Sequence, residues 1–398
     1  MKYDHPNDAL RDLAKKLHPV EIESAQTDLV GRVLAQDVVA DRNSPAADVS
    51  AMDGYAIRMR DLSSSEPLPV RGECKPGAPA VEMPDKGVVR VFTGAIVPAD
   101  CEAVIKREDT EEAETQIRLK PATSTTVAGM HIRRAGENAM KDATVLSPGI
   151  EIHAAHQATM ANFGCATADV YRTVSVSILT TGDEVGVFEQ DPPKPWQLRN
   201  SNRDSLIALL DAIPWVSITA TEHCIDDRAA LTDTLQRQLQ SSDAIVRTGG
   251  VSMGDYDYVP DVIRDVGGEV VFHGLPIRPG KPVLGAATND GKLLVGLPGN
   301  PVSATIGCRR LTLPLLARLA GVSRWLPHPS FVNLNDAGDK TIPLHWMRLV
   351  QMIKDGTSIP VLSRGSGDLV SLGQSDGFVE LPPGESGKGP WPFYRWTR

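Results

Sequence analysis

The chain has 398 residues, of which 41% are hydrophobic and 23% charged, a composition typical of folded globular proteins rather than disordered or fibrous ones. Its length exceeds that of one ordinary domain, so we expect several modules. The net charge of -9 and the lack of a basic block argue against nucleic acid as a partner, while small anionic ligands remain compatible with local sites.

Cysteine usage and the N-terminus indicate the compartment. The five cysteines are single and scattered, without a Cys-x-x-Cys pair, which argues against zinc clusters and a disulfide framework. The first stretch, MKYDHPNDALRDLAKKL, carries charges throughout and lacks the apolar core of a signal peptide, and no later run is long enough to span a bilayer. We therefore expect a cytoplasmic protein that does not enter a membrane.

The first 170 residues change pattern twice. Leucines at helical spacing in PNDALRDLAKKLHPV predict an amphipathic helix, with Asn7 as its candidate N-cap. From about residue 50 to 148, short runs such as GVVRVFTGAIV, EAVIKRED and TQIRLK are typical of strands broken by Gly and Pro. EIHAAHQATMANFG then returns to a helical pattern. We expect the β-rich module to be inserted between two segments of one helical unit.

Strand-like and helix-like runs alternate from Thr173 onward. TVSVSILTTG, VSITATE, DAIVRTGG and GEVVFHG resemble strands, PVLGA and KLLVGLPG a strand pair, and DSLIALLDAI, DDRAALTDTLQRQLQ and NPVSATIGCRRLTLPLLARLAG helices. This pattern predicts βαβ units and a mainly parallel, doubly wound sheet, which binds ligands at the carboxyl ends of its strands. After about residue 325, HWMRLVQMI and GFVELP indicate a small β module.

The predicted fold class is therefore α/β plus β, in several domains. We expect a helical or linking domain in residues 1–48 and 149–172, and an inserted β-rich domain in residues 49–148. A central α/β domain would follow in residues 173–325, and a small C-terminal β domain in residues 326–398.

A glycine pair follows the strand-like run DAIVRT. Gly249 and Gly250 suit a close backbone approach to a phosphate, although a tight strand-to-helix turn would use the same residues. Ser252, Asp255 and Asp257 add a hydroxyl and two carboxylates within a few residues. The loop is therefore a candidate site for an anion together with a hard cation.

Two further loops follow predicted strands. TTGDEV contributes Asp183 and Glu184, which are either a solvated turn or, where the strands are neighbours, part of a shared divalent-cation site. LPGNPVSA places Gly299 after a strand, Asn300 at an N-cap and Pro301 at the first helical position, so free amides are expected to face an anion.

The remaining candidates lie on turns. IRPGKP supplies Arg278 and Lys281 on a Pro-Gly frame, and a solvated basic turn is the alternative. SAMDGYAIR, FTGAIVPADCEAVI and RRAGEN combine turn glycines with Asp53, Thr93, Arg133, Arg134 and Glu137. The residues alone thus predict a multi-domain protein whose α/β domain binds a phosphorylated ligand with a divalent cation. They do not name a reaction.

Taken in order, MDGYA, FTGA, RRAGEN, TGDE, NSNRD, TGGVSMGDYDY, PGKP and LPGNPVSA resemble the MoeA-type molybdopterin molybdenumtransferases, the family that includes the E domain of gephyrin. The resemblance runs from about residue 5 to 325 and is looser beyond. It implies an enzyme that, with a divalent cation, usually Mg²⁺, cleaves adenylylated molybdopterin, inserts molybdenum from molybdate into the dithiolene and releases AMP.

The resemblance also implies an architecture and partners. Its α/β domain would be of the molybdopterin-binding type, in an elongated four-part subunit that works as a homodimer. The active cleft would lie between the α/β domain of one chain and the β-rich part of the other. Other proteins of molybdenum cofactor synthesis are candidate partners.

The resemblance assigns roles to particular residues. Cation and phosphate would be positioned by Glu184, Asp226 and Asp257. The catalytic set is expected to comprise Asp53, Thr93, Glu184, Asp226, Asp257, Arg278 and Lys281. Substrate binding is expected from Gly249, Gly250, Ser252, Gly299, Asn300, Pro301, Arg133, Arg134, Glu137, Asn138, Arg348, Ser366 and Ser371. Phosphoanhydride cleavage needs charge neutralisation more than a strong base, which fits acidic metal ligands combined with basic side chains.

Two departures from the family pattern keep alternatives open. Asn138 stands where the family commonly has Asp in a GED turn, and Gly274 stands where some members carry a lysine, which Arg278 would partly replace. A non-catalytic pterin-binding paralogue or one that prefers tungstate is therefore a second hypothesis. A nucleotidyltransferase that makes the adenylylated pterin is a third, against which the β insertion and the C-terminal module argue.

Overall fold

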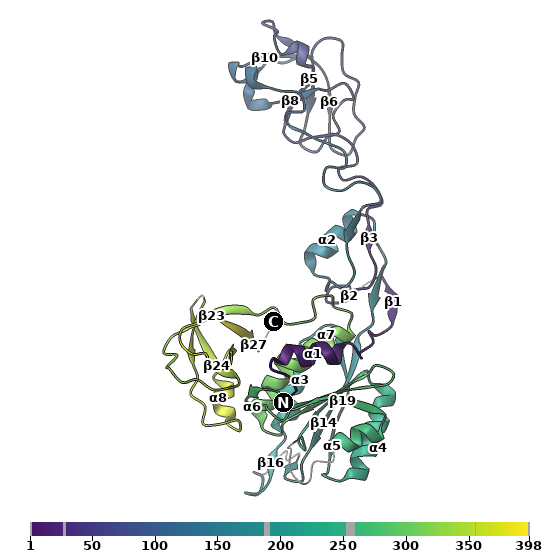
Figure 1. Ribbon diagram of the computed structural model, residues 1–398. Helices are drawn as coiled ribbons and strands as arrows, with labels where there is room; N and C mark the ends of the chain where they lie inside the picture. The colour runs from purple at the N-terminus through teal and green to yellow at the C-terminus, as the bar shows by residue number, and fades with distance from the viewer. Residues whose placement is uncertain (1, 27–28, 187–191, 252–258, 355, 397–398) are drawn as a thin grey trace. The chain divides into compact units, whose positions relative to one another are not determined.

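The computed structural model describes residues 2–26, 29–186, 192–251, 259–354 and 356–396 (Figure 1). It divides into two compact units, which we describe separately. The large unit comprises Met1–Gln36, Pro148–Gln157 and Thr167–Arg398, and the small unit comprises Asp37–Ser147 and Ala158–Ala166. The boundary passes through helix α2 (Ala154–Asn162). Within the described residues, no helix combines the length and apolar character needed to cross a membrane.

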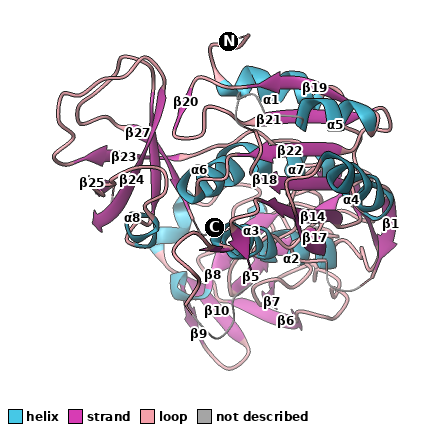
Figure 2. Ribbon diagram, turned by 90° about the horizontal axis from the view of Figure 1, so that it is seen from below, coloured by secondary structure: helices cyan, strands magenta, loops and turns pink. Residues whose placement is uncertain are grey.

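The large unit is built around a six-stranded sheet in the order β17-β14-β18-β22-β21-β19 (Figure 2). The first four strands are parallel, and β21 and β19 continue the sheet as antiparallel strands. The strands are Val174–Thr181 (β14), Val216–Cys224 (β17), Ala244–Thr248 (β18), Gly268–His273 (β19), Leu284–Thr288 (β21) and Leu293–Leu297 (β22). The predicted mainly parallel sheet is confirmed.

Helices cover both faces of this sheet (Figures 1 and 2). Apolar residues of α4 (Arg228–Ser241) and α5 (Val259–Asp265) form one core cluster with the sheet. A larger cluster on the other face contains residues of α1 (Pro6–Ala14), α3 (Ser201–Asp211), α6 (Pro301–Gly307) and α7 (Leu313–Leu319). Strands buried on both sides are often continuous apolar runs, as in β22.

The strand order places a switch point beside β14. The chain runs from β14 through α3 to β17 on one side, and then through α4 to β18 on the other side of β14. The loops that follow β14 and β18 therefore leave the sheet in a crevice, where doubly wound sheets bind their ligands. Thr180 and Thr248 are register partners at this edge, so both loops begin at the same level.

Two helix details differ from the predictions. His5, not Asn7, is the N-cap of α1, and its Nδ1 accepts a hydrogen bond from the Asn7 backbone N–H at 3.0 Å, because Pro6 occupies the first helical position. The single long helix predicted from residue 300 is instead interrupted by a π-helical turn, η4 (Cys308–Thr312), between α6 and α7. The interruption immediately precedes Leu313-Pro314, where the proline lacks an N–H for the helical hydrogen bonds.

The C-terminal part of the large unit is a second six-stranded sheet, in the order β20-β24-β25-β23-β27-β26. Its strand β20 comes from the α/β segment and pairs in parallel with β24. The strands are Ile277–Arg278 (β20), Ser330–Leu334 (β23), His345–Lys354 (β24), Thr357–Pro360 (β25), Gly377–Leu381 (β26) and Trp391–Arg395 (β27). The short helix α8 (Leu369–Gly373) precedes β26. The strands predicted in HWMRLVQMI and GFVELP are confirmed.

A buried ion pair joins η4 to this second sheet. Arg310 Nε donates to Glu380 Oε2 at 2.7 Å, and both side chains are almost fully buried. Burial alone would raise the pKa of the Glu380 carboxyl, but the charge of Arg310 and the contact with His345 hold it at about 2. The stabilisation that depends on this carboxylate is therefore present above the ordinary pKa of 4.5 and is lost as the pH falls towards 2.

We expect Glu380→Ala to lower the free energy of unfolding at neutral pH by about 3–5 kcal/mol, because it leaves the Arg310 guanidinium buried without its counter-charge. Urea unfolding measures this change. Glu222→Ala, which removes the partner of Arg237 from an exposed ion pair, is the matched control and is expected to cost at most about 1 kcal/mol. Equal losses in both variants would contradict the interpretation.

Three short strands of the large unit form the sheet β1-β13-β2 (Ile22–Ala25, Ala168–Tyr171 and Val33–Leu34), in a region where a helical or linking domain was expected. A two-stranded pair, β15 (Val185–Gly186) and β16 (Leu198–Arg199), lies between β14 and α3 in the chain.

The small unit is β-rich, as predicted. Its main sheet has the order β8-β5-β7-β6-β10-β9, and the unit also contains the strand pairs β11-β4 and β12-β3. Its strands are Val38–Val39 (β3), Val49–Ser50 (β4), Gly54–Ile57 (β5), Leu68–Cys74 (β6), Val88–Val91 (β7), Ala103–Lys106 (β8), Thr110–Glu112 (β9), Gln116–Leu119 (β10), Ile132–Arg133 (β11) and Thr144–Leu146 (β12). Its short helices are Met59–Asp61 (η1), Arg107–Asp109 (η2) and Pro121–Thr125 (η3).

Candidate active site

A cavity of about 910 Å³ lies at the carboxyl ends of the parallel strands of the large unit. It brings together residues from loops that are far apart in the sequence. The predicted site residues that line it are Glu184, Asp226, Gly249, Gly250, Gly299, Asn300 and Pro301. The register explains this convergence, because Thr181 lies opposite Cys224, and Thr248 opposite Leu297. We call this the strand-end cavity.

The backbone conformation and close neighbours of the glycine pair in this cavity leave no room for a side chain. Gly249 and Gly250 have φ angles of 92° and 52°, in the left-handed region. A Cβ atom on Gly249 would lie 2.6 Å from Thr181 Oγ1, and one on Gly250 would lie 2.5 Å from Arg247 Nη2. The Gly249 N–H donates to the Leu297 carbonyl at 3.1 Å, which ties this loop to the neighbouring strand.

Two carboxylates among the described residues line the strand-end cavity. Glu184 and Asp226 both line it, and the Asp226 N–H donates to Asp183 Oδ1 at 3.2 Å, which joins the loops after β14 and β17. Carboxylate oxygens are the ligands that Mg²⁺ prefers, so this donor set fits a divalent cation. Ser252, Asp255 and Asp257, which the sequence adds to this loop, lie outside the described residues.

A second cavity, of about 940 Å³, lies between the α/β part and the C-terminal sheet of the large unit. Its basic residues are Arg278, Lys281, Lys340 and Arg348, and Ser366 also lines it. It shares Pro282, Pro298 and Asn300 with the strand-end cavity, so the two adjoin. We call this the basic cavity. Asp336 is its one carboxylate among the described lining residues.

Arg348 is held by contacts around its guanidinium. Its carbon Cζ lies 4.5 Å from the centroid of the Trp346 ring, and its Nη1 donates to the Ala337 carbonyl at 2.7 Å. Burial lowers the pKa of Arg348, since the charged form is partly removed from water. A guanidinium that is ordered and half-desolvated in this way is well prepared to bind an anion.

The start of α6 contributes less to anion binding than predicted. Asn300 is the N-cap and Pro301 follows it, as expected, but the Val302 N–H donates to the Ser366 carbonyl at 3.0 Å. One of the backbone amides that was expected to be free for an anion is therefore already hydrogen-bonded to the C-terminal module. Ser371 lines neither cavity; its buried hydroxyl donates to the Asp368 carbonyl within α8.

Asp53 and Thr93 form a pair in the small unit. Asp53 Oδ1 accepts hydrogen bonds from both the backbone N–H and the hydroxyl of Thr93, each at 2.7 Å. These two bonds lower the pKa of the Asp53 carboxyl, the backbone bond most. The carboxylate is thus ionised and fixed in direction. The Thr93 hydroxyl is already engaged as a donor, so it offers lone pairs rather than a free proton.

The RRAGEN turn is an internally bonded cluster. Arg133 Nε donates to Glu137 Oε1 at 2.5 Å, and its Nη2 donates to Asn138 Oδ1 at 2.9 Å. Arg134 pairs with Asp48 at 2.5 Å. The ion pair with Arg133 lowers the pKa of Glu137. Both arginines, predicted to bind substrate, are therefore already paired with carboxylates within the small unit.

Comparison with known proteins defines the family. The family description "MoeA N-terminal region (domain I and II)" matches residues 5–164, and "Probable molybdopterin binding domain" matches residues 177–318. The molybdopterin molybdenumtransferase of Haemophilus influenzae is 34% identical over 315 residues, which cover 75% of this chain and 73% of the relative. The molybdopterin molybdenumtransferase of Bacillus subtilis is 31% identical over 385 residues, which cover 91% of this chain and 86% of the relative. The chain belongs to the molybdopterin molybdenumtransferase family.

Solved structures agree with this assignment. A molybdopterin biosynthesis MoeA protein from Pyrococcus horikoshii superposes with a TM-score of 0.75 at 27% identity, with 99% of both chains covered. A second structure of that description, at 23% identity and a TM-score of 0.79, supports the fold alone and covers 100% of this chain and 98% of that one. The likeness extends across both units and the C-terminal sheet.

Sequence reasoning missed residues that shape the site of this family member. Asn200 is buried, and its side chain caps α3 through the Arg203 N–H and donates to Thr180 Oγ1 at 2.7 Å. Asn202 Nδ2 donates to the Gly299 carbonyl at 2.7 Å, which fixes the loop before α6. The signal was present in the NSNRD motif, where an asparagine precedes a helical run. Trp346 and Lys340 of the basic cavity carried no comparable local signal.

Gly249→Ala is expected to weaken binding of the adenylylated pterin by about tenfold or more, since the added methyl group collides with Thr181 and strains a left-handed backbone. Titration calorimetry with adenylylated molybdopterin measures the change. Gly267→Ala is the control for backbone strain alone, because that glycine lines neither cavity and has a φ of 81°, but nothing lies within 4 Å of a Cβ atom built on it. Unchanged pterin affinity in Gly249→Ala would contradict a close approach of ligand and backbone at the glycine pair.

Proposed function

We propose that this protein is a molybdopterin molybdenumtransferase that accepts adenylylated molybdopterin and molybdate, inserts molybdenum into the dithiolene and releases AMP. The observation that carries the proposal is the adjoining pair of cavities in the large unit, one lined by glycines and carboxylates and the other by arginine and lysine. They share Asn300, so a ligand in one lies next to a ligand in the other. A reaction between a pterin nucleotide and an oxyanion needs such a pair.

The strand-end cavity suits the nucleotide end of the pterin. Gly249 and Gly250 allow a phosphate to approach the backbone, and Gly299 extends this surface. Glu184 and Asp226, with Asp257 as a proposed third ligand, would hold Mg²⁺, which would supply neutralisation of phosphate charge there. The loop contacts of Asp183, Asn200 and Asn202 keep these groups in place.

The basic cavity suits the oxyanion. Arg278, Lys281 and Arg348 provide positive charge, and Ser366 provides a polar group from the opposite module. Gly274, which replaces a lysine found in some relatives, has a φ of 88°, so the backbone at this position is adapted to glycine. Arg278 and Lys340 are the side chains that we propose take over the missing charge.

We further propose a homodimer in the cytoplasm. Asp53, Thr93 and the RRAGEN turn belong to the small unit, and the resemblance assigns these motifs to a cleft shared by two chains. Sedimentation velocity tests the assembly, with a dimer expected and a monomer contradicting it. None of the five cysteines takes part in a disulfide, which agrees with a reducing compartment.

Asn138→Asp is expected to raise molybdate-dependent turnover, if the asparagine is a real loss from the family pattern. Asn138 Oδ1 accepts from Arg133 at 2.9 Å, and an aspartate keeps this acceptor while adding a charge. The initial rate of AMP release measures the effect. An unchanged rate would show that position 138 does not limit the reaction.

The test of the proposed function is AMP release from adenylylated molybdopterin by the purified protein with Mg²⁺, without oxyanion, with molybdate and with tungstate. Release that depends on molybdate supports the transferase. Release that depends on tungstate alone would assign the altered-specificity alternative. Tight pterin binding without release under any condition would assign the non-catalytic paralogue and overturn the proposal.

A further inference from the structure

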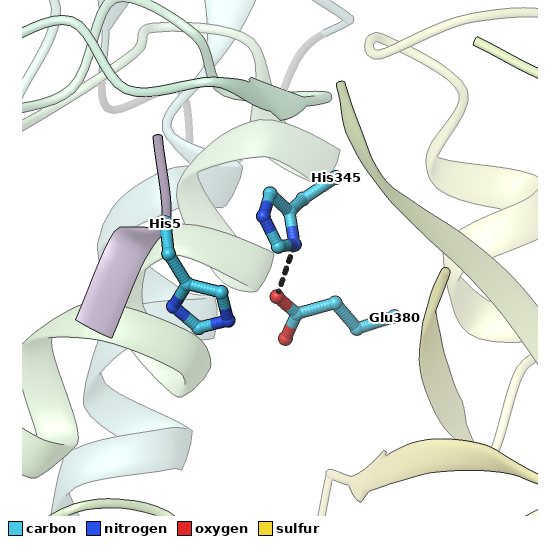
Figure 3. Close-up of side chains that lie close together, drawn as sticks. All are labelled: His5, His345 and Glu380. Atoms are coloured by element: carbon cyan, nitrogen blue, oxygen red, sulfur yellow. Dashed lines mark ion pairs between the residues drawn. The ribbon is translucent and has the colours of Figure 1, made fainter. Parts of the chain in front are cut away.

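A buried polar cluster lies where α1, η4 and the C-terminal sheet of the large unit meet (Figure 3). Arg310 donates to both oxygens of Glu380, from Nε at 2.7 Å and from Nη2 at 3.3 Å. His345 Nδ1 lies 3.0 Å from Glu380 Oε1. Arg310, Glu380 and His345 are 1%, 5% and 4% exposed, so these contacts are shielded from water. The three residues come from η4, β26 and β24.

His5 completes the cluster from the start of the chain. Its ring lies edge-on to that of His345, with centroids 4.7 Å apart and an interplanar angle of 86°. Its Nδ1 accepts the Asn7 N–H, so the proton of the neutral ring sits on Nε2. Burial lowers the pKa of His5, which favours this neutral form. In Figure 3 the His5 ring faces the Glu380 carboxylate across the cluster.

The ligand atoms of His5, His345 and Glu380 all lie within 4.8 Å of one another, close enough to suggest a metal ion. Two observations argue against that. The tautomer that caps α1 keeps His5 Nε2 protonated, and metal-bound imidazole needs a bare nitrogen. Both Glu380 oxygens already accept from the Arg310 guanidinium, whose charge would repel a second cation. The cluster is therefore a guanidinium-carboxylate pair flanked by the imidazole rings of His5 and His345.

Two members of the cluster, Arg310 and His345, lie on segments that line the basic cavity. Arg310 belongs to the helical segment that begins at Asn300, and residues of its first turn line that cavity. His345 immediately precedes Trp346 on β24, the strand that also carries Arg348. His345 and Trp346 pair with Ile277 and Arg278 of β20. The cluster thus joins the helical wall to the strand wall of one cavity.

We propose that Arg310, Glu380, His345 and His5 act together as positioning residues that set the separation of these two walls and thereby the affinity of the basic cavity for its oxyanion. The inference rests on the proposed function in taking molybdate as that oxyanion. Directional contacts such as a guanidinium-carboxylate pair fix one relative placement of two modules, whereas apolar packing tolerates small shifts. A shift between the two modules would change the distance from Arg348 on β24 to the residues of α6 that line the same cavity.

The test uses the full-length protein with His5→Asn and Arg310→Lys. Asparagine is a good N-cap, so His5→Asn keeps the start of α1 while it removes the imidazole from the cluster. Lysine keeps the charge of Arg310 but loses the two-pronged contact with Glu380. Arg237→Lys, which alters an exposed two-pronged pair on α4 at the other face of the sheet, is the matched control.

Two affinities are measured by titration calorimetry, for molybdate alone and for adenylylated molybdopterin alone, together with the urea unfolding midpoint. We expect both cluster variants to bind molybdate about tenfold more weakly, while pterin affinity and the affinities of Arg237→Lys stay at the wild-type values. A purely structural role would instead lower the unfolding midpoint and the fraction of active protein, without changing molybdate affinity in the folded fraction.

The outcomes separate this inference from the proposed function. If the wild-type protein binds molybdate and both cluster variants bind it equally well, the positioning role is wrong. If the variants lose molybdate affinity while the wild-type protein releases no AMP, the proposed reaction fails and the positioning role stands. A wild-type protein that binds no molybdate would overturn both.

Discussion

Glu184→Ala is expected to slow magnesium-dependent AMP release from adenylylated molybdopterin by about 100-fold or more. Cleavage of a phosphoanhydride develops charge on phosphate oxygens, and its rate depends on neutralising that charge. Glu184 and Asp226 line the strand-end cavity together, and the loops that carry them are joined by the hydrogen bond from Asp226 to Asp183. The loss of one carboxylate removes a proposed cation ligand while it leaves the strands of the sheet intact.

The measurement is the initial rate of AMP release as a function of Mg²⁺ concentration. We expect Glu184→Ala to need more Mg²⁺ for its remaining activity, and Asp226→Ala to behave similarly. Asp233→Ala, at an exposed position of α4, is the control and is expected to keep the wild-type rate. Full activity of Glu184→Ala at low Mg²⁺ would contradict the proposed cation site.

Arg348→Ala is expected to raise the molybdate concentration required for half-maximal AMP release by about tenfold to 100-fold, with a smaller effect on pterin affinity. The Arg348 guanidinium stacks on Trp346 and lines the basic cavity, and its partial desolvation strengthens its attraction for an anion. Truncation to alanine removes both the charge and this ordered geometry.

Rate measurements over a range of molybdate concentrations test this expectation. Arg348→Lys is expected to fall between the wild type and Arg348→Ala, because lysine keeps the charge but not the two-pronged geometry. Lys388→Ala, an exposed basic residue of the same module, is the control and should leave the molybdate requirement unchanged. If Lys388→Ala raised the molybdate requirement as much as Arg348→Ala does, the effect would come from the overall positive charge of the module rather than from the basic cavity.

The central sheet was predictable because strand-like runs, either apolar and buried as in β22 or alternating as in β17, stand between helical patterns in the sequence. The meeting of the loops followed from the same reasoning, since the carboxyl ends of parallel strands lie at one edge. The structure accordingly places Glu184, Asp226 and the glycine pair around one cavity. Positive φ angles at Gly249 and Gly250 are the physical reason why glycines stand there.

Features that depend on distant parts of the chain were not predictable. Arg310 and Glu380 are 70 residues apart, and no local pattern indicates that a basic residue in an apolar helix will meet a carboxylate on a later strand. The π turn that carries Arg310 was not predicted either, because Pro314 by itself does not indicate how the helix before it is interrupted. The basic cavity depends on the docking of the C-terminal sheet, which the sequence does not specify locally.

Two other differences between the predictions and the structure arise because neighbouring residues compete for the same local role. Asn7 fits the N-cap pattern, but Pro6 fills the first helical position, which moves the cap to His5. Arg133 and Glu137 are four residues apart, and the structure pairs them with each other in the turn where both were predicted to bind substrate. The spacing of Arg133 and Glu137 is itself a signal for this ion pair, because side chains of opposite charge this close in the sequence can reach one another.

The most direct test of the account is to measure molybdenum in the pterin that the protein releases, beside the AMP formed in the same reaction with Mg²⁺ and molybdate. Elemental analysis of the isolated pterin gives the first quantity and chromatography the second. The account predicts that metal-loaded pterin and AMP appear in equal amounts and that both disappear without molybdate. Release of AMP with a pterin that contains no molybdenum would contradict it.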